Sequence, residues 1–177
     1  LPPKSQWPEH GAPGKHEAEK AFEMTFQKKL ADRGWLAMAW PKEFGGGGRP
    51  AIDRLIVAEE MIKVGAPIAA TWFADRQMGP ALMQYGTREQ VDRYLPEMLA
   101  GETTWCIGMS EPNAGSDLAS LTTKAERDGD HFRITGQKIW TSFGAEADYC
   151  YLICRTSTGR APHEGISEVI VPMSTPG

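Results

Sequence analysis

The stretch MSEPNAGSD, residues 109–117, lies between two regions that are richer in apolar side chains. Residues 111–112 indicate a turn, and residues 113–115 are small enough for a ligand to approach the main chain. The main-chain N–H groups and the hydroxyls of Ser110 and Ser116 suit oxygen-rich or anionic groups such as carbonyls and phosphates. Taken alone, the same residues also fit a plain turn between two strands.

The region before this stretch has the apolar period of helices. In EAEKAFEMTFQKKLADRGW, residues 17–35, apolar side chains recur at steps of four, and Gly34 marks the end of the pattern. The stretch WPKEFGGGGRP, residues 40–50, is a loop, because two prolines and four glycines do not sustain a helix. Thr87 and Gln90 have the spacing of a capping box. We expect helices within residues 17–35, 51–67, 75–85 and 87–102, the last bent or divided by Pro96.

The region from Thr103 onward has the composition of strands. An Asp-Gly-Asp turn separates two of them, and the apolar stretch ADYCYLICRT is another. Strands are expected within residues 103–109, 122–140, 147–156 and 165–173. We therefore predict an α+β multi-domain chain. Residues 1–104 form an all-α domain, and residues 105–177 form an incomplete, antiparallel, barrel-like β domain.

Composition excludes several functional classes. The 177 residues carry a net charge of −4 without a lysine or arginine block, which argues against nucleic-acid binding. No apolar run approaches the roughly 18 residues of a membrane span, and the start does not resemble a secretory signal, so we expect a cytoplasmic protein. Four scattered histidines predict no metal site. Of the three cysteines, Cys150 and Cys154 lie about 13 Å apart along one strand, too far for a disulfide, so buried thiols are expected.

A second stretch, GQKIWTSFG at residues 136–144, places Trp140 two positions before Ser142 at the end of an expected strand. By itself, Trp140 fits either a core residue or an aromatic surface that stacks on a cofactor.

Together, these stretches resemble the acyl-CoA dehydrogenase family, with further similarity over residues 79–102, 105–156 and 165–177. Members of that family have a helical N-terminal domain, a β middle domain and a C-terminal four-helix bundle. This chain is similar to the first and to part of the second, which implies a fragment. The family's catalytic glutamate comes from the bundle or a helix near it. The resemblance therefore implies no catalytic residue here, and little activity and weak FAD affinity for these residues alone.

The reaction implied by the resemblance begins with removal of the α-proton of an acyl-CoA thioester. The β-hydrogen leaves as hydride to N5 of FAD, and the product is a trans-2-enoyl-CoA. Met109 and Ser110 would reach the pyrimidine end of the flavin, and Trp140 would pack against its ring. Ser142 would direct its hydroxyl toward N5, and Ser116 would reach the FAD pyrophosphate or the acyl-CoA substrate. The implied cofactor-binding set is Ile107, Gly108, Met109, Ser110, Gly115, Ser116, Trp140, Thr141 and Ser142.

The resemblance also implies an electron-transfer flavoprotein as acceptor and a homo- or hetero-tetramer. Many members have Thr where this chain has Ser110 and Ser142, which predicts weaker orientation of the hydroxyl rather than another reaction. Glu111 is expected to hold the turn by hydrogen bonds. Two alternatives stay open: a flavin oxidase or monooxygenase of the same fold, and a non-catalytic subunit of a heteromeric dehydrogenase. The acyl group, fatty or steroid side chain, is also open.

Overall fold

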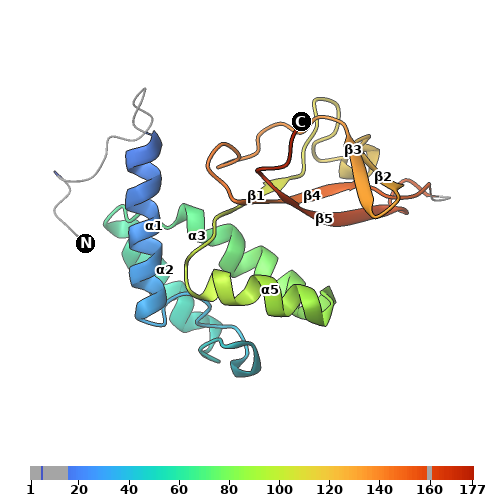
Figure 1. Ribbon diagram of the computed structural model, residues 1–177. Helices are drawn as coiled ribbons and strands as arrows, with labels where there is room; N and C mark the ends of the chain where they lie inside the picture. Colours follow the sequence, from blue (N-terminus) through green and yellow to red (C-terminus); the bar gives the residue numbers. More distant parts are fainter. Residues whose placement is uncertain (1–4, 6–15, 159–160) are drawn as a thin grey trace. The chain divides into compact units, whose positions relative to one another are not determined.

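The computed structural model describes residue 5 and residues 16–158 and 161–177. The chain forms two compact units, Leu1–Thr104 and Trp105–Gly177. The first is helical and the second contains the sheet (Figure 1). The predicted order of a helical region followed by a sheet region is confirmed.

The helical unit begins with a helix that ends where Gly34 takes a left-handed φ of 64°. One continuous helical stretch, residues 69–85, contains a single π-helical segment in its middle. The elements of this unit are α1 (His16–Asp32), η2 (Lys42–Phe44), α2 (Ala51–Lys63), α3 (Ala69–Phe73), the π-helical η3 (Ala74–Met78), α4 (Gly79–Tyr85) and α5 (Arg88–Leu99).

The predicted capping box is present at the start of α5. The Gln90 N–H donates to Thr87 Oγ1 at 3.3 Å, and the Thr87 N–H donates to Gln90 Oε1 at 2.8 Å. Pro96 lies inside the helix, which runs on to Leu99, so α5 is not divided.

Trp40 anchors the glycine-rich loop to the rest of the helical unit. Its side chain is 3% exposed, and its indole N–H donates to the Asp75 carbonyl at 2.7 Å. A Cβ at Gly79 would lie 2.0 Å from the Trp40 ring. Only glycine therefore allows the helix to approach this indole so closely.

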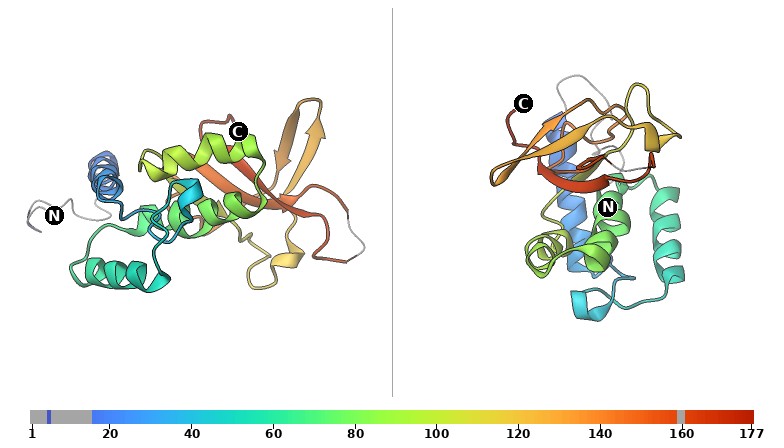
Figure 2. Two further views of the ribbon diagram at one scale, coloured as in Figure 1. Left: turned by 90° about the horizontal axis from the view of Figure 1, so that it is seen from below. Right: turned by 90° about the vertical axis from the view of Figure 1, so that its right-hand side faces the viewer.

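The sheet unit is built around β4 (Tyr149–Arg155). β1 runs parallel to it, β5 runs antiparallel to it along its whole length, and β2 meets it only at the Lys124–Arg155 pair. The hairpin of β2 and β3 therefore extends beyond the end of β4 (Figure 2). The other strands are β1 (Trp105–Gly108), β2 (Lys124–Asp128), β3 (His131–Thr135) and β5 (Ile166–Pro172).

This arrangement corrects the expected strand directions. The sheet is mixed rather than antiparallel, and the described strands do not close into a barrel. The reason is the long connection between β1 and β4, which returns the chain to the same end of the sheet, so that the two strands run in the same direction. One face of β4 packs into a small core that includes all three thiols: Cys106, Ala125, Ala147, Cys150, Leu152 and Cys154. The cysteines are free and buried, as expected.

Candidate functional site

The parallel pairing of β1 and β4 brings the two segments identified in the sequence together. The first segment follows β1, and the second precedes β4. The Ile139 N–H donates to the Ser110 carbonyl at 2.9 Å, and Lys138 Nζ donates to the Met109 carbonyl at 2.9 Å. Residues 109–110 and 138–139 are therefore in direct contact within the sheet unit.

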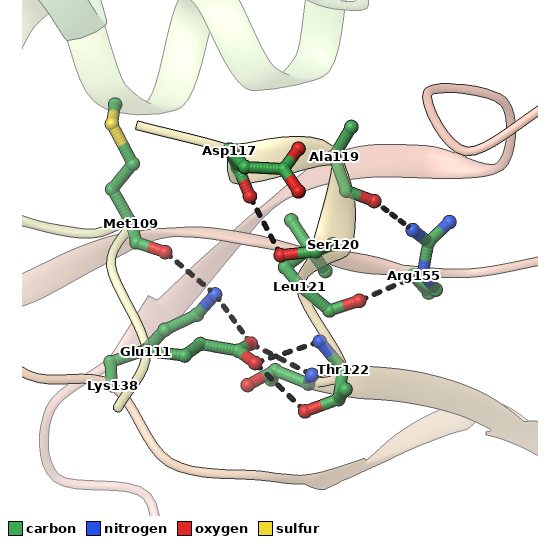
Figure 3. Close-up of polar contacts among 10 residues, drawn as sticks. Met109, Glu111, Asp117, Ala119, Ser120, Leu121, Thr122, Lys138 and Arg155 are labelled. Atoms are coloured by element: carbon green, nitrogen blue, oxygen red, sulfur yellow. Dashed lines mark hydrogen bonds and ion pairs between the residues drawn. The ribbon is translucent and has the colours of Figure 1, made fainter. Parts of the chain in front are cut away.

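Glu111 holds the turn between these segments and β2. Its N–H and carbonyl bond the carbonyl and N–H of Ala114 at 2.8 and 3.1 Å, which closes the turn. The carboxylate accepts hydrogen bonds from the Thr122 N–H at 2.7 Å, the Thr122 hydroxyl at 2.8 Å and the Thr123 N–H at 2.8 Å. Lys138 adds a fourth donor at 3.0 Å (Figure 3). The carboxylate is thus fully engaged, in agreement with the structural role expected for it.

The environment of Glu111 keeps it ionised. Burial acts to raise the pKa of this carboxyl, but the hydrogen bonds from Thr123 and Thr122 outweigh burial and hold the pKa well below its usual range. Such a carboxylate is a poor proton acceptor, so Glu111 is unsuited to act as a general base.

Trp140 has an unusual conformation for a tryptophan. Its φ is 57° and its side chain is 87% exposed. Phe143, three residues later, also has a positive φ, 63°. Non-glycine residues in this region are uncommon, and strained residues cluster at active sites and ligand-binding loops. The loop therefore presents a large aromatic surface outward.

Several polar groups of the two segments have no hydrogen-bond partner among the described residues. Within the described part of the chain, the hydroxyls of Ser110, Ser116 and Ser142 take part in no hydrogen bond, and the Ser110 N–H has no acceptor. Gly115 is exposed, and a Cβ placed there would meet nothing within 4 Å. Free hydroxyl and N–H donors and an exposed indole are the kinds of group that suit the polar edge and the aromatic face of a flavin.

The structure places the predicted residues in three groups. Met109 and Ser110 lie against the segment that leads to Trp140, Thr141 and Ser142. Ile107 is half-buried in β1, and Gly108 is buried, with Leu152 and Cys150 where its Cβ would be. Gly115 and Ser116 are exposed at the far end of the turn, and among the described residues no hydrogen bond joins them to residues 138–142.

Two residues that position this site were missed by sequence reasoning. Lys138 contacts both Met109 and Glu111. The guanidinium of Arg155, at the end of β4, donates to the carbonyls of Ala119 and Leu121 and fixes η4 (Leu118–Ser120) (Figure 3). The sequence held one clue to both residues: each is a cation within a largely apolar segment. A cation that becomes buried there requires a hydrogen-bond or ionic partner.

Other kinds of site find no support in the described residues. No group of three histidine, cysteine or acidic side chains there could hold a metal ion. Among the same residues, no helix is both long enough and apolar enough to cross a membrane. An apolar groove of about 640 Å³ lies in the helical unit, beside Phe22, Phe26 and Trp35, and none of the predicted site residues lines it.

Solved structures share this fold at substantial sequence identity. The Tcur3481-Tcur3483 steroid ACAD is 46% identical with a TM-score of 0.79, over 84% of this chain and 38% of that one. The ChsE4-ChsE5 complex from Mycobacterium tuberculosis is 42% identical with a TM-score of 0.81, over 92% of this chain and 42% of the matched chain. A glutaryl-CoA dehydrogenase from Mycobacterium smegmatis in complex with FADH2 is 27% identical with a TM-score of 0.73, over 94% of this chain and 43% of the matched chain.

Sequence comparison gives the same family. Acyl-CoA dehydrogenase FadE26 of Mycobacterium tuberculosis is 48% identical over 147 residues, which are 81% of this chain and 36% of that protein. The chain thus spans less than half the length of such relatives. The family profile of the acyl-CoA dehydrogenase N-terminal domain matches residues 8–102, and that of the middle domain matches residues 106–177. The chain belongs to the acyl-CoA dehydrogenase family.

Proposed function

We propose that this chain supplies the flavin-contacting segments of an FAD-dependent acyl-CoA dehydrogenase. The observation that carries the proposal is the direct contact between residues 109–110 and 138–139, next to an outward-facing Trp140. Family membership supports the same conclusion, because the two segments are those in which the resemblance expects the cofactor site.

In this proposal, the residues would contact different parts of FAD. The indole of Trp140 would pack on the flavin ring, while the N–H and hydroxyl of Ser110 would donate to its pyrimidine end. Thr141 and Ser142 would line the same side, with the Ser142 hydroxyl directed to N5. Ser116 would bind the FAD pyrophosphate or the substrate. FAD, when bound, supplies the capacity to accept the β-hydrogen of an acyl-CoA thioester as hydride.

We infer that the base that removes the α-proton is not Glu111, the acidic residue that directly follows Ser110. Its side chain is 4% exposed and its carboxylate accepts from four donors, so it has neither access to a substrate nor a free lone pair for one. In keeping with the family resemblance, the proposal assigns no catalytic base among residues 1–177, and expects these residues alone to bind FAD weakly and to turn over little acyl-CoA.

Substrate and assembly are proposed by analogy with the similar structures. One is named a steroid ACAD and another is a complex of two chains, ChsE4 and ChsE5. We therefore favour an acyl-CoA with a bulky polycyclic acyl group and a hetero-oligomeric assembly. An electron-transfer flavoprotein as acceptor and a cytoplasmic location remain predictions.

The test uses the protein purified as its gene encodes it, alone and with any subunit that co-purifies. FAD binding is measured by flavin fluorescence, and oxidation of steroid and fatty acyl-CoA thioesters is measured with a dye acceptor. Dye reduction by acyl-CoA supports the proposal. Peroxide formation without the dye would instead identify an oxidase, and FAD carried only by a co-purifying partner would identify a non-catalytic subunit.

Trp140→Ala is the most direct test of the flavin position. Aromatic packing adds about 0.5–1.5 kcal/mol beyond buried area, so FAD binding should weaken by roughly 2- to 12-fold, with a changed visible spectrum. Phe132→Ala is the matched control, because Phe132 is also an exposed aromatic residue of the sheet unit, at 52% exposure. Equal FAD affinity in Trp140→Ala and the unaltered protein would show that the ring lies elsewhere.

A further inference from the structure

Lys138 is a buried cation between the two flavin-contacting segments. Its side chain is 9% exposed, and Nζ donates to the Met109 carbonyl at 2.9 Å and to Glu111 Oε1 at 3.0 Å. Figure 3 shows the amine between these two oxygens. Glu111 is itself held by Thr122 and Thr123, so Lys138 is bonded to a fixed anion rather than to a mobile one.

The carbonyl that Lys138 contacts belongs to the same peptide unit as the Ser110 N–H. A cationic donor on a peptide oxygen polarises the whole unit, and hydrogen bonds in such chains strengthen one another. The Ser110 N–H is thereby made a stronger donor, and it has no acceptor within the described chain. The carbonyl of Ser110 accepts from the Ile139 N–H at 2.9 Å, so the main chain is fixed on both sides of this donor.

We propose that the Lys138–Glu111 pair is a positioning device that orients and polarises the Ser110 N–H toward the electron-rich pyrimidine end of the flavin. The pair thereby raises FAD affinity and favours the reduced cofactor, whose negative charge a strong donor stabilises. This inference rests on the proposed function and deepens it. Lys138 and Glu111 act through Ser110 and do not themselves contact the cofactor.

A purely structural ion pair is the alternative, and one set of variants separates the two roles. Lys138→Met removes the cation and leaves Glu111 unpaired, whereas Glu111→Gln/Lys138→Met removes both charges. Lys138→Arg keeps a cation. Lys124→Met is the matched control, because Lys124 forms an exposed pair with Glu126 at 3.0 Å, with side chains 49% and 58% exposed.

The measurements are FAD affinity, the flavin reduction potential and the thermal midpoint of the protein purified as its gene encodes it. We expect FAD binding to weaken about tenfold in both Lys138→Met and the double variant. We expect these variants to bind reduced FAD a further tenfold more weakly than oxidised FAD. For a two-electron couple, this corresponds to a flavin reduction potential about 30 mV lower than in the unaltered protein. Lys138→Arg should recover part of the FAD affinity and part of the reduction potential, and Lys124→Met should match the unaltered protein in both.

The outcome in the double variant decides between the roles. If removing both charges restores FAD affinity and potential together with stability, the pair is structural and the inference is wrong. If the unaltered protein binds no FAD, the proposed function fails instead. Amide hydrogen exchange at Ile139 then still tests the positioning, since Lys138→Met should speed this exchange and Lys124→Met should not. If Lys138→Met does not fold, the double variant and Lys138→Arg provide the same comparison.

Discussion

At the scale of single residues, Glu111 links stability to pH. Glu111→Gln leaves Lys138 buried without an anion, and breaking a buried pair costs roughly 3–5 kcal/mol. We expect a loss of that order in the unfolding free energy at pH 7, measured by urea denaturation. This figure is the largest loss of unfolding free energy that we expect, because a glutamine can still accept some of the four hydrogen bonds.

The sign of the pH dependence follows from the depressed pKa of Glu111. Its stabilisation is fully present above the pKa of the unfolded chain, about 4.3 for a glutamate, and is lost as the pH falls from there through the folded-state pKa. The difference in unfolding free energy between the unaltered protein and Glu111→Gln should therefore narrow below about pH 4. A difference that stays constant down to the lowest pH at which both proteins fold would contradict this account.

At the scale of elements, the segment that leads to Trp140 depends on Gly136. Its φ is 152°, and a Cβ there would lie 2.3 Å from Thr123 Oγ1 and 2.6 Å from Thr123 Cα. Because the Thr123 N–H also donates to Glu111, Gly136→Ala must move either the segment that leads to Trp140 or the residues before β2 that hold the turn. We expect a loss of at least about 3 kcal/mol in unfolding free energy, from overpacking and backbone strain combined.

Gly129→Ala is the control for Gly136→Ala. Gly129, in the hairpin between β2 and β3, also has a positive φ, 62°, but a Cβ there would meet nothing within 4 Å. Only the cost of the left-handed backbone remains, roughly 1–2 kcal/mol. Equal losses in the two variants would show that contact with Thr123 does not limit the position of this segment.

At the scale of the molecule, the three thiols report how the sheet unit opens. Cys106, Cys150 and Cys154 are 0%, 8% and 0% exposed. The hydrogen bond between Cys106 and Cys150 raises the pKa of the Cys106 thiol, together with burial, but lowers the pKa of the Cys150 thiol. Burial is what all three thiols share, and it keeps the reagent away from each of them. Iodoacetamide should therefore label none of them quickly in the native protein and all three in denaturant, as counted by mass spectrometry. A single thiol that reacts at the rate of a free cysteine would show local opening of the core around β4.

The sequence by itself determined the features that arise from near neighbours along the chain. Helical and strand periods, the capping box of Thr87 and Gln90, and the turn at Gly129 all follow from local backbone preferences, and each is present. The order of a helical and a sheet unit follows in the same way. Periodicity did not determine burial, because Ile52, Leu55 and Ile56 of α2 have the three- and four-residue spacing of an apolar helix face but are 53–60% exposed.

Only the tertiary structure decided the direction of the strands and the neighbours of the site. The parallel register sets Cys106 opposite Cys150, and it brings Lys138 to the carbonyl of Met109, 29 positions earlier. Such contacts depend on how distant strands pair, and a local pattern does not specify a distant partner. Trp140 is likewise exposed and has a left-handed backbone that its residue type disfavours, and neither feature could be read from the sequence, which left both a core and a ligand-facing tryptophan open.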